Sequence, residues 1–229
     1  MSLSRGRFPG RLSLPDLDPA TLAHYRLHWS GEALYNHPEQ FPALTAKQLF
    51  GVDAPLALDV GCATGEFVCG LAAQHPERFF LGVEMSRKPI EHAVARALAL
   101  GAANIRFLQA DMTLAAPLLV PASLSAVYIH FPVPFTTTHK RKHYTYSPAM
   151  LAHYRRAFVA GGRLSIVTDE PRVVEDTQRM LADAADFRQV AEADWQLALD
   201  DHLKSPYQRL WEKRKRAIWR AEYKIDSVR

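Results

Sequence analysis

The chain has 229 residues, of which 48% are hydrophobic and 23% charged, with a formal net charge of +4. This length and composition suffice for one sizeable core. They exclude a membrane-spanning segment, because no apolar run is long enough to cross a bilayer, and the N-terminus has no apolar signal core. Two cysteines, Cys62 and Cys69, fit no metal-site spacing and favour a reducing compartment, so we predict a cytoplasmic location without membrane attachment.

Charged residues are segregated along the sequence. Residues 169–201 contain ten acids and three arginines, whereas residues 204–229 contain nine Lys or Arg and three acids. Basic groups concentrated in one segment favour a polyanionic partner more than the small net charge does.

The first fifty residues are predicted to be a basic arm followed by a helical lead-in. Residues 1–17 carry Arg5, Arg7 and Arg11 among Gly, Pro and Ser. This composition is typical either of a plain flexible tail or of an arm that orders on a polyanion. One helix is expected from Asp18-Pro19 to about Trp29 and a second from Pro38 to Phe50. Residues 51–229 form the main part, and no linker precedes them, so we expect a single domain.

From Leu56 onward, predicted strands and helices alternate. Apolar runs predict five buried strands, at Leu56–Val60, Phe79–Val83, Asn104–Ala110, Leu124–His130 and Arg163–Val167. Helical spacing and terminal signals predict helices at Phe67–Ala73, from Ser86 to Leu100, from Ser147-Pro148 to Gly161-Gly162, and from Pro171 to about Ala185. Met112–Pro121 is expected to be a short irregular connection.

The last segment alternates in polarity with a period of two. One face carries Ala217, Trp219, Ala221, Tyr223 and Ile225, and the other carries Arg220, Glu222 and Lys224. This alternation predicts a strand with one wetter face, antiparallel at the margin of the sheet. The whole order predicts a doubly wound α/β fold, with a mostly parallel sheet and helices on both faces.

Small residues occupy alternate positions after the first strand. Gly61, Ala63 and Gly65 follow Asp59 and form a turn that lets the backbone approach a ligand closely while helix amides point at it. A dinucleotide-binding turn would have its third small residue where this chain has Glu66, so the pattern argues against NAD. The motif resembles the first motif of class I methyltransferases, which bind S-adenosylmethionine. A purely structural turn is the alternative.

Two more acids end the next two strands. Glu84 follows the turn by about twenty residues, which is where an α/β nucleotide site has a carboxylate for the ribose hydroxyls. Asp111 ends the third strand and could reach the adenine edge, with Met112 next to it. The alternative is that Glu84 and Asp111 merely cap the following helices.

The fourth strand leads into a stiff apolar segment and then a basic one. His130-Phe131-Pro132-Val133-Pro134-Phe135 suits stacking of a planar base, or else is a rigid turn. The following segment, 136–144, contains Lys140, Arg141 and Lys142, which could grip phosphates. His139 and His143 lack cysteine or carboxylate partners nearby in the sequence, so we expect no metal site.

With these motifs in place, the sequence from about Leu49 to Ile225 resembles the tRNA (guanine-N7)-methyltransferase family. The family's Phe-Pro-Asp-Pro-Trp segment and basic loop are matched by Phe131–Phe135 and the run that follows. Its Thr-Asp after the fifth strand is matched by Thr168-Asp169, and its C-terminal Thr-x-Tyr/Phe-Glu by Ser205-Pro206-Tyr207-Gln208. The resemblance implies a seven-stranded Rossmann-like sheet whose last strand is antiparallel.

The resemblance also implies site residues. The cofactor side comprises Asp59, Gly61, Ala63, Gly65, Glu84, Asp111 and Met112; the substrate and RNA side comprises Phe135, Lys140, Arg141, Lys142, Ser205, Tyr207 and Gln208. The chain departs from the family on the substrate side, where the family's active-site Asp is Val133, its Lys is Thr137, and its Thr and Glu are Ser205 and Gln208.

Guanine N7 carries an exposed lone pair and no proton, so its methylation needs no general base. Positioning of donor and acceptor can supply catalysis, and a nearby carboxylate can stabilise the charge that develops on the base. We predict that Asp169 is this carboxylate.

The predicted function is S-adenosylmethionine-dependent methylation of guanine in tRNA by a monomer or homodimer. Two alternatives stay open: a diverged methyltransferase with a small-molecule or other RNA acceptor, and a paralogue that binds RNA or cofactor without turnover. Val133 favours both alternatives, whereas the basic segments favour RNA.

Overall fold

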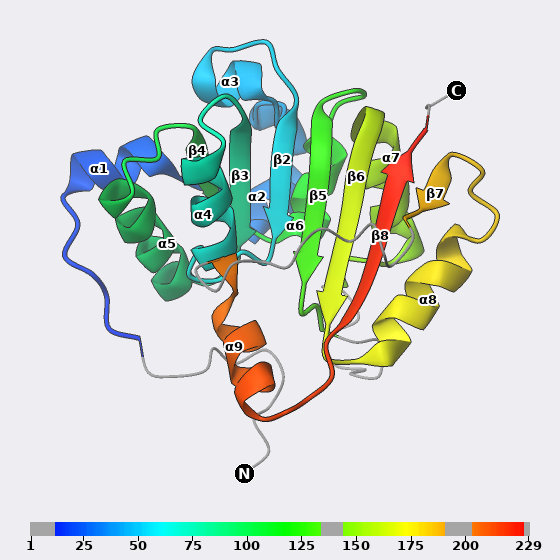
Figure 1. Ribbon diagram of the computed structural model, residues 1–229. Coiled ribbons are helices and arrows are strands. Elements are labelled where there is room, and N and C mark those ends of the chain that lie inside the picture. Colours follow the sequence, from blue (N-terminus) through cyan, green and yellow to red (C-terminus); the bar gives the residue numbers. More distant parts are fainter. Residues whose placement is uncertain (1–11, 134–143, 191–202, 227–229) are drawn as a thin grey trace.

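The computed structural model describes residues 12–133, 144–190 and 203–226. Within these residues one sheet of eight strands forms the centre of the molecule, in the order β1-β4-β3-β2-β5-β6-β8-β7 (Figure 1). Neighbouring strands from β1 to β6 in this order are parallel, and β8 is antiparallel to both β6 and β7.

The strands are β1 (Arg26–His28), β2 (Leu56–Val60), β3 (Phe79–Glu84), β4 (Ile105–Gln109), β5 (Leu124–His130), β6 (Phe158–Thr168), β7 (Phe187–Gln189) and β8 (Trp219–Ile225). The α-helices are α1 (Pro19–Tyr25), α2 (Gly31–Asn36), α3 (Ala46–Phe50), α4 (Glu66–Gln74), α5 (Arg87–Ala99), α6 (Met112–Ala115), α7 (Pro148–Ala157), α8 (Pro171–Leu181) and α9 (Pro206–Lys213). Short 3-10 helices cover Pro38–Gln40 and Ala116–Leu118.

Helices cover both faces of the sheet and enclose two apolar cores. Strand β2 shows why: Leu56, Leu58 and Val60 pack into one core with residues of α2, α3, α6, α7 and α8. Ala57 points the other way, into a core with residues of α1, α4 and α5. Successive side chains of a strand alternate between faces, so a strand that is apolar throughout can serve two cores at once.

The predicted fold class is confirmed, with eight strands rather than seven among the described residues. The added strand at one edge is β1, which lies inside the segment predicted as a helix from Asp18 to Trp29. The helix ends at Tyr25, because Arg26–His28 pair with β4 in parallel. A three-residue strand has too little periodicity to be distinguished from a helix end.

Three other boundaries were wrong. The predicted helix from Pro38 to Phe50 is a 3-10 turn and the separate helix α3, and α2 precedes them. The connection Met112–Pro121 contains α6 and a 3-10 turn. Helix α7 ends at Ala157, and β6 runs through Gly161-Gly162. The pairing of β5 with β6 jumps from Leu124↔Phe158 to Ala126↔Arg163, so the glycine pair lies in a bulge of the strand rather than at a helix end.

Strand β8 also departs from the predicted division of its faces. Glu222, expected on the wetter face, is buried, and its Oε1 accepts a hydrogen bond of 2.5 Å from the Ser165 hydroxyl of β6. Burial raises the pKa of Glu222. Trp219, expected on the apolar face, is 47% exposed, because it begins the strand opposite Thr168, where β6 ends.

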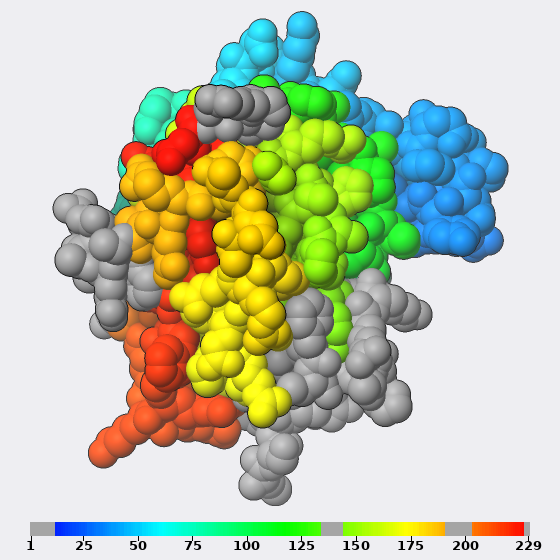
Figure 2. All heavy atoms as spheres, turned by 90° about the vertical axis from the view of Figure 1, so that its right-hand side faces the viewer, coloured from blue at the N-terminus to red at the C-terminus, as the bar shows by residue number. Residues whose placement is uncertain are grey.

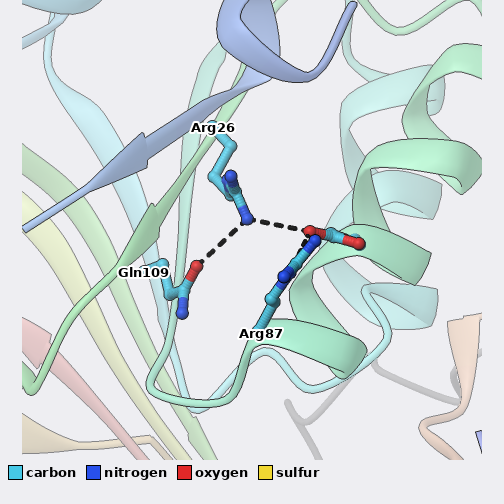
Figure 3. Close-up of polar contacts among 4 residues, drawn as sticks. Arg26, Arg87 and Gln109 are labelled. Atoms are coloured by element: carbon cyan, nitrogen blue, oxygen red, sulfur yellow. Dashed lines mark hydrogen bonds and ion pairs between the residues drawn. The ribbon is translucent and has the colours of Figure 1, made fainter. Parts of the chain in front are cut away.

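A charge cluster joins the lead-in to the main sheet. The Glu91 carboxylate of α5 accepts hydrogen bonds from Arg26 of β1 at 2.9 Å and from Arg87 at 2.7 Å, and Arg26 also donates to the Gln109 side chain of β4 (Figure 3). The Glu91 side chain is 4% exposed and that of Arg87 is 63% exposed. The buried acid therefore holds an edge strand against the helix that follows β3.

Among the described residues, no helix combines the length and the hydropathy that crossing a membrane requires.

Replacement of Glu91 tests this cluster. Glu91→Gln keeps the shape of the side chain but leaves the Arg26 guanidinium without its counter-charge, so we expect the free energy of unfolding to fall by about 2–4 kcal/mol. The control, Arg87→Ala, removes only an exposed partner and should cost less than about 1 kcal/mol. Urea denaturation measures both, and equal losses in the two variants would contradict the assignment.

Candidate functional site

The turn between β2 and α4 lies at the carboxyl end of the sheet, where ligands of open α/β sheets bind. The amides of Gly61 and Cys62 both donate to the Val83 carbonyl of β3, at 2.8 and 3.0 Å, and the Gly65 amide donates to the Cys62 carbonyl at 2.9 Å. The turn is therefore fastened to the neighbouring strand before the helix begins.

Gly61 and Gly65 are glycines for different reasons. Both have positive φ, of 80° and 76°. A Cβ on Gly65 would lie 2.7 Å from the Ala93 Cβ, so this residue lets α4 pack against α5. A Cβ on Gly61 would meet no atom within 4 Å, which leaves open space in front of the turn. Ala63, between them, adopts φ 49° although it has a side chain, which is strained backbone.

Glu66 stabilises the turn from behind, a role that the sequence did not reveal. Its buried carboxylate accepts hydrogen bonds from the Thr64 hydroxyl at 2.6 Å and from Arg96 of α5 at 2.7 Å. Arg96 also donates to the Thr64 carbonyl at 3.2 Å. Glu66, the residue that distinguishes this turn from a dinucleotide-binding turn, therefore stabilises the turn through Thr64 and Arg96.

Two acids end adjacent strands beside the turn. Asp59 is 3% exposed, and burial together with the nearby Glu84 charge raises the pKa of Asp59 to about 8. Burial also raises the pKa of Glu84, although the Ser86 amide donates to its Oε1 at 2.8 Å. A buried and a half-buried carboxyl group whose charges repel each other form a site suited to a positively charged ligand.

Asp111 and Met112 have clear local roles. The Oδ1 of Asp111 accepts from both the amide and the hydroxyl of Thr113, at 2.9 and 2.7 Å, and so caps α6. Asp111 therefore acts as a helix cap, and its side chain stays partly exposed just beyond the end of β4. The Met112 side chain is buried in the core that also contains Leu108 and Ala110.

The end of β5 carries a buried imidazole. His130 is half-buried; its Nε2 atom is buried and has no hydrogen-bond partner among the described residues, and its ring lies 4.4 Å from the Phe67 ring of α4. Burial and the charge of Arg220 lower the pKa of His130 to about 3, so the ring is neutral. It lies on the same face of the sheet as Tyr128.

Phe131 and Tyr207 form an aromatic pair across the rim. Phe131 has φ 54° and donates its amide to the Val167 carbonyl at 2.6 Å, which turns the chain away from β5. Its ring is stacked with that of Tyr207 of α9, with centroids 6.4 Å apart and planes at 25°. Burial and the Glu84 charge raise the pKa of Tyr207 to about 12. Helix α9 thus lies across the carboxyl ends of the strands (Figure 1).

The other predicted C-terminal residues build α9. The Ser205 hydroxyl caps the helix by accepting from the Gln208 amide at 3.2 Å. The Gln208 side chain is buried and donates to Glu212 at 3.0 Å.

Asp169 follows β6 and is held by an ion pair. Arg216 donates to its Oδ2 at 2.8 Å, and the Asp169 side chain is 8% exposed. Val133 is half-buried three residues beyond β5. Phe135, Lys140, Arg141 and Lys142 lie outside the described residues, as do Thr137, His139 and His143. Within the described part of the chain, no three His, Cys, Asp or Glu residues are grouped so that they could hold a metal.

Comparison with known proteins identifies the family. Residues 53–221 match the model of a family described as "Putative methyltransferase". The tRNA (guanine-N(7)-)-methyltransferase of Rubrobacter xylanophilus is 38% identical over 213 residues, covering 93% of this chain and 96% of its own length. That of Chloroflexus aggregans is 39% identical over 216 residues, covering 94% and 95%.

A solved structure supports the fold. That of the 16S rRNA methyltransferase KamB has a TM-score of 0.55 and 18% identity, covering 79% of this chain and 92% of its own. At this identity the likeness shows the fold alone. Taken with the relatives, it leads to one conclusion: the chain belongs to the tRNA (guanine-N7)-methyltransferase family.

Proposed function

We propose that this protein transfers the methyl group of S-adenosylmethionine to N7 of a guanine in tRNA. The observation that carries the proposal is the pair of acids beside the open turn at Gly61, the buried Asp59 and the half-buried Glu84. The names of the relatives that cover nearly the whole chain support the substrate. The described residues fit the cofactor, which carries a positive charge and a nucleoside.

The cofactor-side roles follow from the positions of these residues. Gly61 would provide the close backbone approach, in a turn completed by Ala63 and by Gly65, which packs against α5; Glu84 and the ionised form of Asp59 would provide negative charge. Asp111 keeps a partly exposed carboxylate at the end of β4, while Met112 supports it from the core. When bound, the cofactor supplies an electrophilic methyl group.

The substrate side acts by binding and charge stabilisation. The N7 lone pair needs no base, so the protein has to hold the guanine in line with the donor and exclude water. Asp169 would stabilise the positive charge that develops on the base. Phe131 and Tyr207 would form the apolar wall next to it. Phe135, Lys140, Arg141 and Lys142 are proposed to contact RNA.

The single-domain organisation is also a proposal, as are the cytoplasmic location and the monomeric or homodimeric state. The packing of Trp29, Leu34 and Leu44 into the same core as β2 supports a single domain.

A matched pair of glycine variants tests the cofactor turn. Gly61 and Gly51 have similar φ, 80° and 76°, and an added Cβ meets nothing within 4 Å at either position. Alanine should therefore strain both sites alike, by about 1–2 kcal/mol. Only Gly61→Ala fills the space in front of the turn, so we expect it alone to weaken S-adenosylhomocysteine binding, by at least about 10-fold. Calorimetric titration measures this, and equal affinities in the two variants would exclude the turn from the site.

Proton release tests the role of the acids. With a pKa of about 8, Asp59 is mostly protonated at pH 7 in the free protein. A positively charged ligand favours the ionised carboxylate, so binding of S-adenosylmethionine should release protons and tighten as pH rises from 6 to 8. Calorimetry in two buffers of different ionisation enthalpy measures the release. Asp59→Asn should reduce it, and unchanged release in this variant would contradict the prediction.

The reaction itself is tested by incubating labelled cofactor with unmodified tRNA and analysing the bases. Asp169→Asn should lower kcat by about 10- to 100-fold, because it removes the stabilising charge. Asp186→Asn is the matched control, since Asp186 is bound by Arg155 in a similarly exposed ion pair near β7. Turnover on tRNA that Asp169→Asn leaves unchanged would contradict its role. Label in another base, or in none, would favour a different acceptor or a non-catalytic binder, as Val133 suggests.

A further inference from the structure

Four consecutive cations begin at the last residue of α9, and an exposed tryptophan follows them. Lys213, Arg214, Lys215 and Arg216 are all exposed, and Trp219 is 47% exposed. We call these five residues the basic aromatic surface. Lys215 adopts φ 54°, a strained conformation for a residue with a side chain. Ala63 and Phe131 at the carboxyl rim also have positive φ, as does Ala122 in the turn before β5.

The basic aromatic surface borders Asp169, the proposed substrate carboxylate. Trp219 lies opposite Thr168, the last residue of β6, and Arg216 pairs with Asp169, the next residue of the chain. Helix α9 and the turn that follows it lie below the carboxyl ends of the parallel strands in Figure 1. Figure 2 shows this segment, in orange to red, projecting from the lower edge of the molecule beside α8. This surface therefore lies at the carboxyl end of the parallel strands, where the proposed site is.

The charge of this surface is only partly compensated. Glu212 is bound by Lys204 at 2.9 Å, and Asp169 by Arg216. No acid within the described ranges forms an ion pair with Lys213 or Lys215. Arg214 and Arg216 lie over the Trp211 ring, at 5.5 and 4.7 Å, so the buried Trp211 orients their guanidinium groups. The result is a fixed positive surface with one aromatic face at its end.

We propose that the basic aromatic surface binds RNA, with Trp219 stacking an unpaired base near the methylated guanine and the cations holding the adjacent phosphates. Proteins recognise splayed RNA nucleotides by this combination of aromatic stacking and cationic contacts. The inference rests on the proposed function, because it places the RNA partner beside the same pocket. The residues of the basic aromatic surface are not among those to which the family resemblance assigns RNA binding.

Equilibrium binding of unmodified tRNA without cofactor tests the proposal separately from catalysis. Trp219→Ala should weaken binding by about 10-fold or more, whereas Trp219→Phe should retain most of the affinity. The control is Tyr35→Ala, since Tyr35 is the more exposed aromatic, at 76%, and belongs to α2.

A second comparison tests the cations. The double variant Lys213→Gln/Lys215→Gln should release about one to two fewer counterions on binding tRNA, which is measured as a shallower dependence of the affinity on salt concentration. The control Lys47→Gln, in α3, should leave this dependence unchanged.

The outcomes separate this inference from the proposed function. If wild-type protein methylates tRNA but Trp219→Ala and the double Lys variant bind tRNA like wild type, the surface is not the contact and the function stands. If no methyl transfer occurs but both changes weaken tRNA binding, the surface stands and the function fails. Binding of duplex DNA as tight as that of tRNA, with Trp219→Ala having no effect on either, would reduce the surface to a general polyanion patch and overturn the stacking role.

Discussion

Asp59 and Glu84 lie at the ends of neighbouring parallel strands, Asp59 buried and Glu84 half-buried, although their charges repel each other. Such an arrangement costs stability in the free protein unless a proton or a cation compensates it. The rest of the rim keeps it in place. Val83 fastens the turn to β3, and the Glu66–Arg96 pair fastens it to α5. A turn held in this way is ordered before any ligand arrives, which would reduce the ordering that binding of the proposed cationic nucleoside requires.

Helix α9 connects the two halves of the site. Tyr207, near its start, stacks on Phe131, and the charge of Glu84 contributes to raising the pKa of Tyr207, so the same helix borders one of the acids proposed to bind the cofactor and the proposed apolar wall. The turn after the helix sends Arg216 to Asp169. The carboxylate proposed to hold the substrate is therefore linked by one ion pair to a surface of exposed cations. A departure such as Val133 alters the wall while leaving this framework intact.

The central strands could be predicted because each is apolar on both faces, and β2 and β5 have the predicted bounds. That the acids at the ends of these strands lie at one edge could also be predicted, because the carboxyl ends of parallel strands share an edge of the sheet. Strand β1 could not be predicted, because only its pairing with β4 distinguishes Arg26–His28 from a helix end. The bulge in β6 likewise depends on its register with β5, and Gly161-Gly162 by itself is typical of a helix stop.

Long-range ion pairs were the other part that the sequence could not reveal. Glu66 and Arg96 lie thirty residues apart, and nothing local to either residue indicates the contact. The same holds for Asp169 and Arg216, which meet only because β6 and β8 are antiparallel neighbours. Family resemblance identified Ser205 and Gln208, but their structural roles, as a helix cap and a buried amide bound to Glu212, emerged from the fold.

A crystal structure of the protein with S-adenosylhomocysteine tests the central claim most directly. We expect the nucleoside to lie in front of Gly61, with the carboxylates of Asp59, Glu84 and Asp111 turned toward it. Density for the ligand at any other place, or a rim left vacant at saturating concentration with these side chains directed elsewhere, would contradict it.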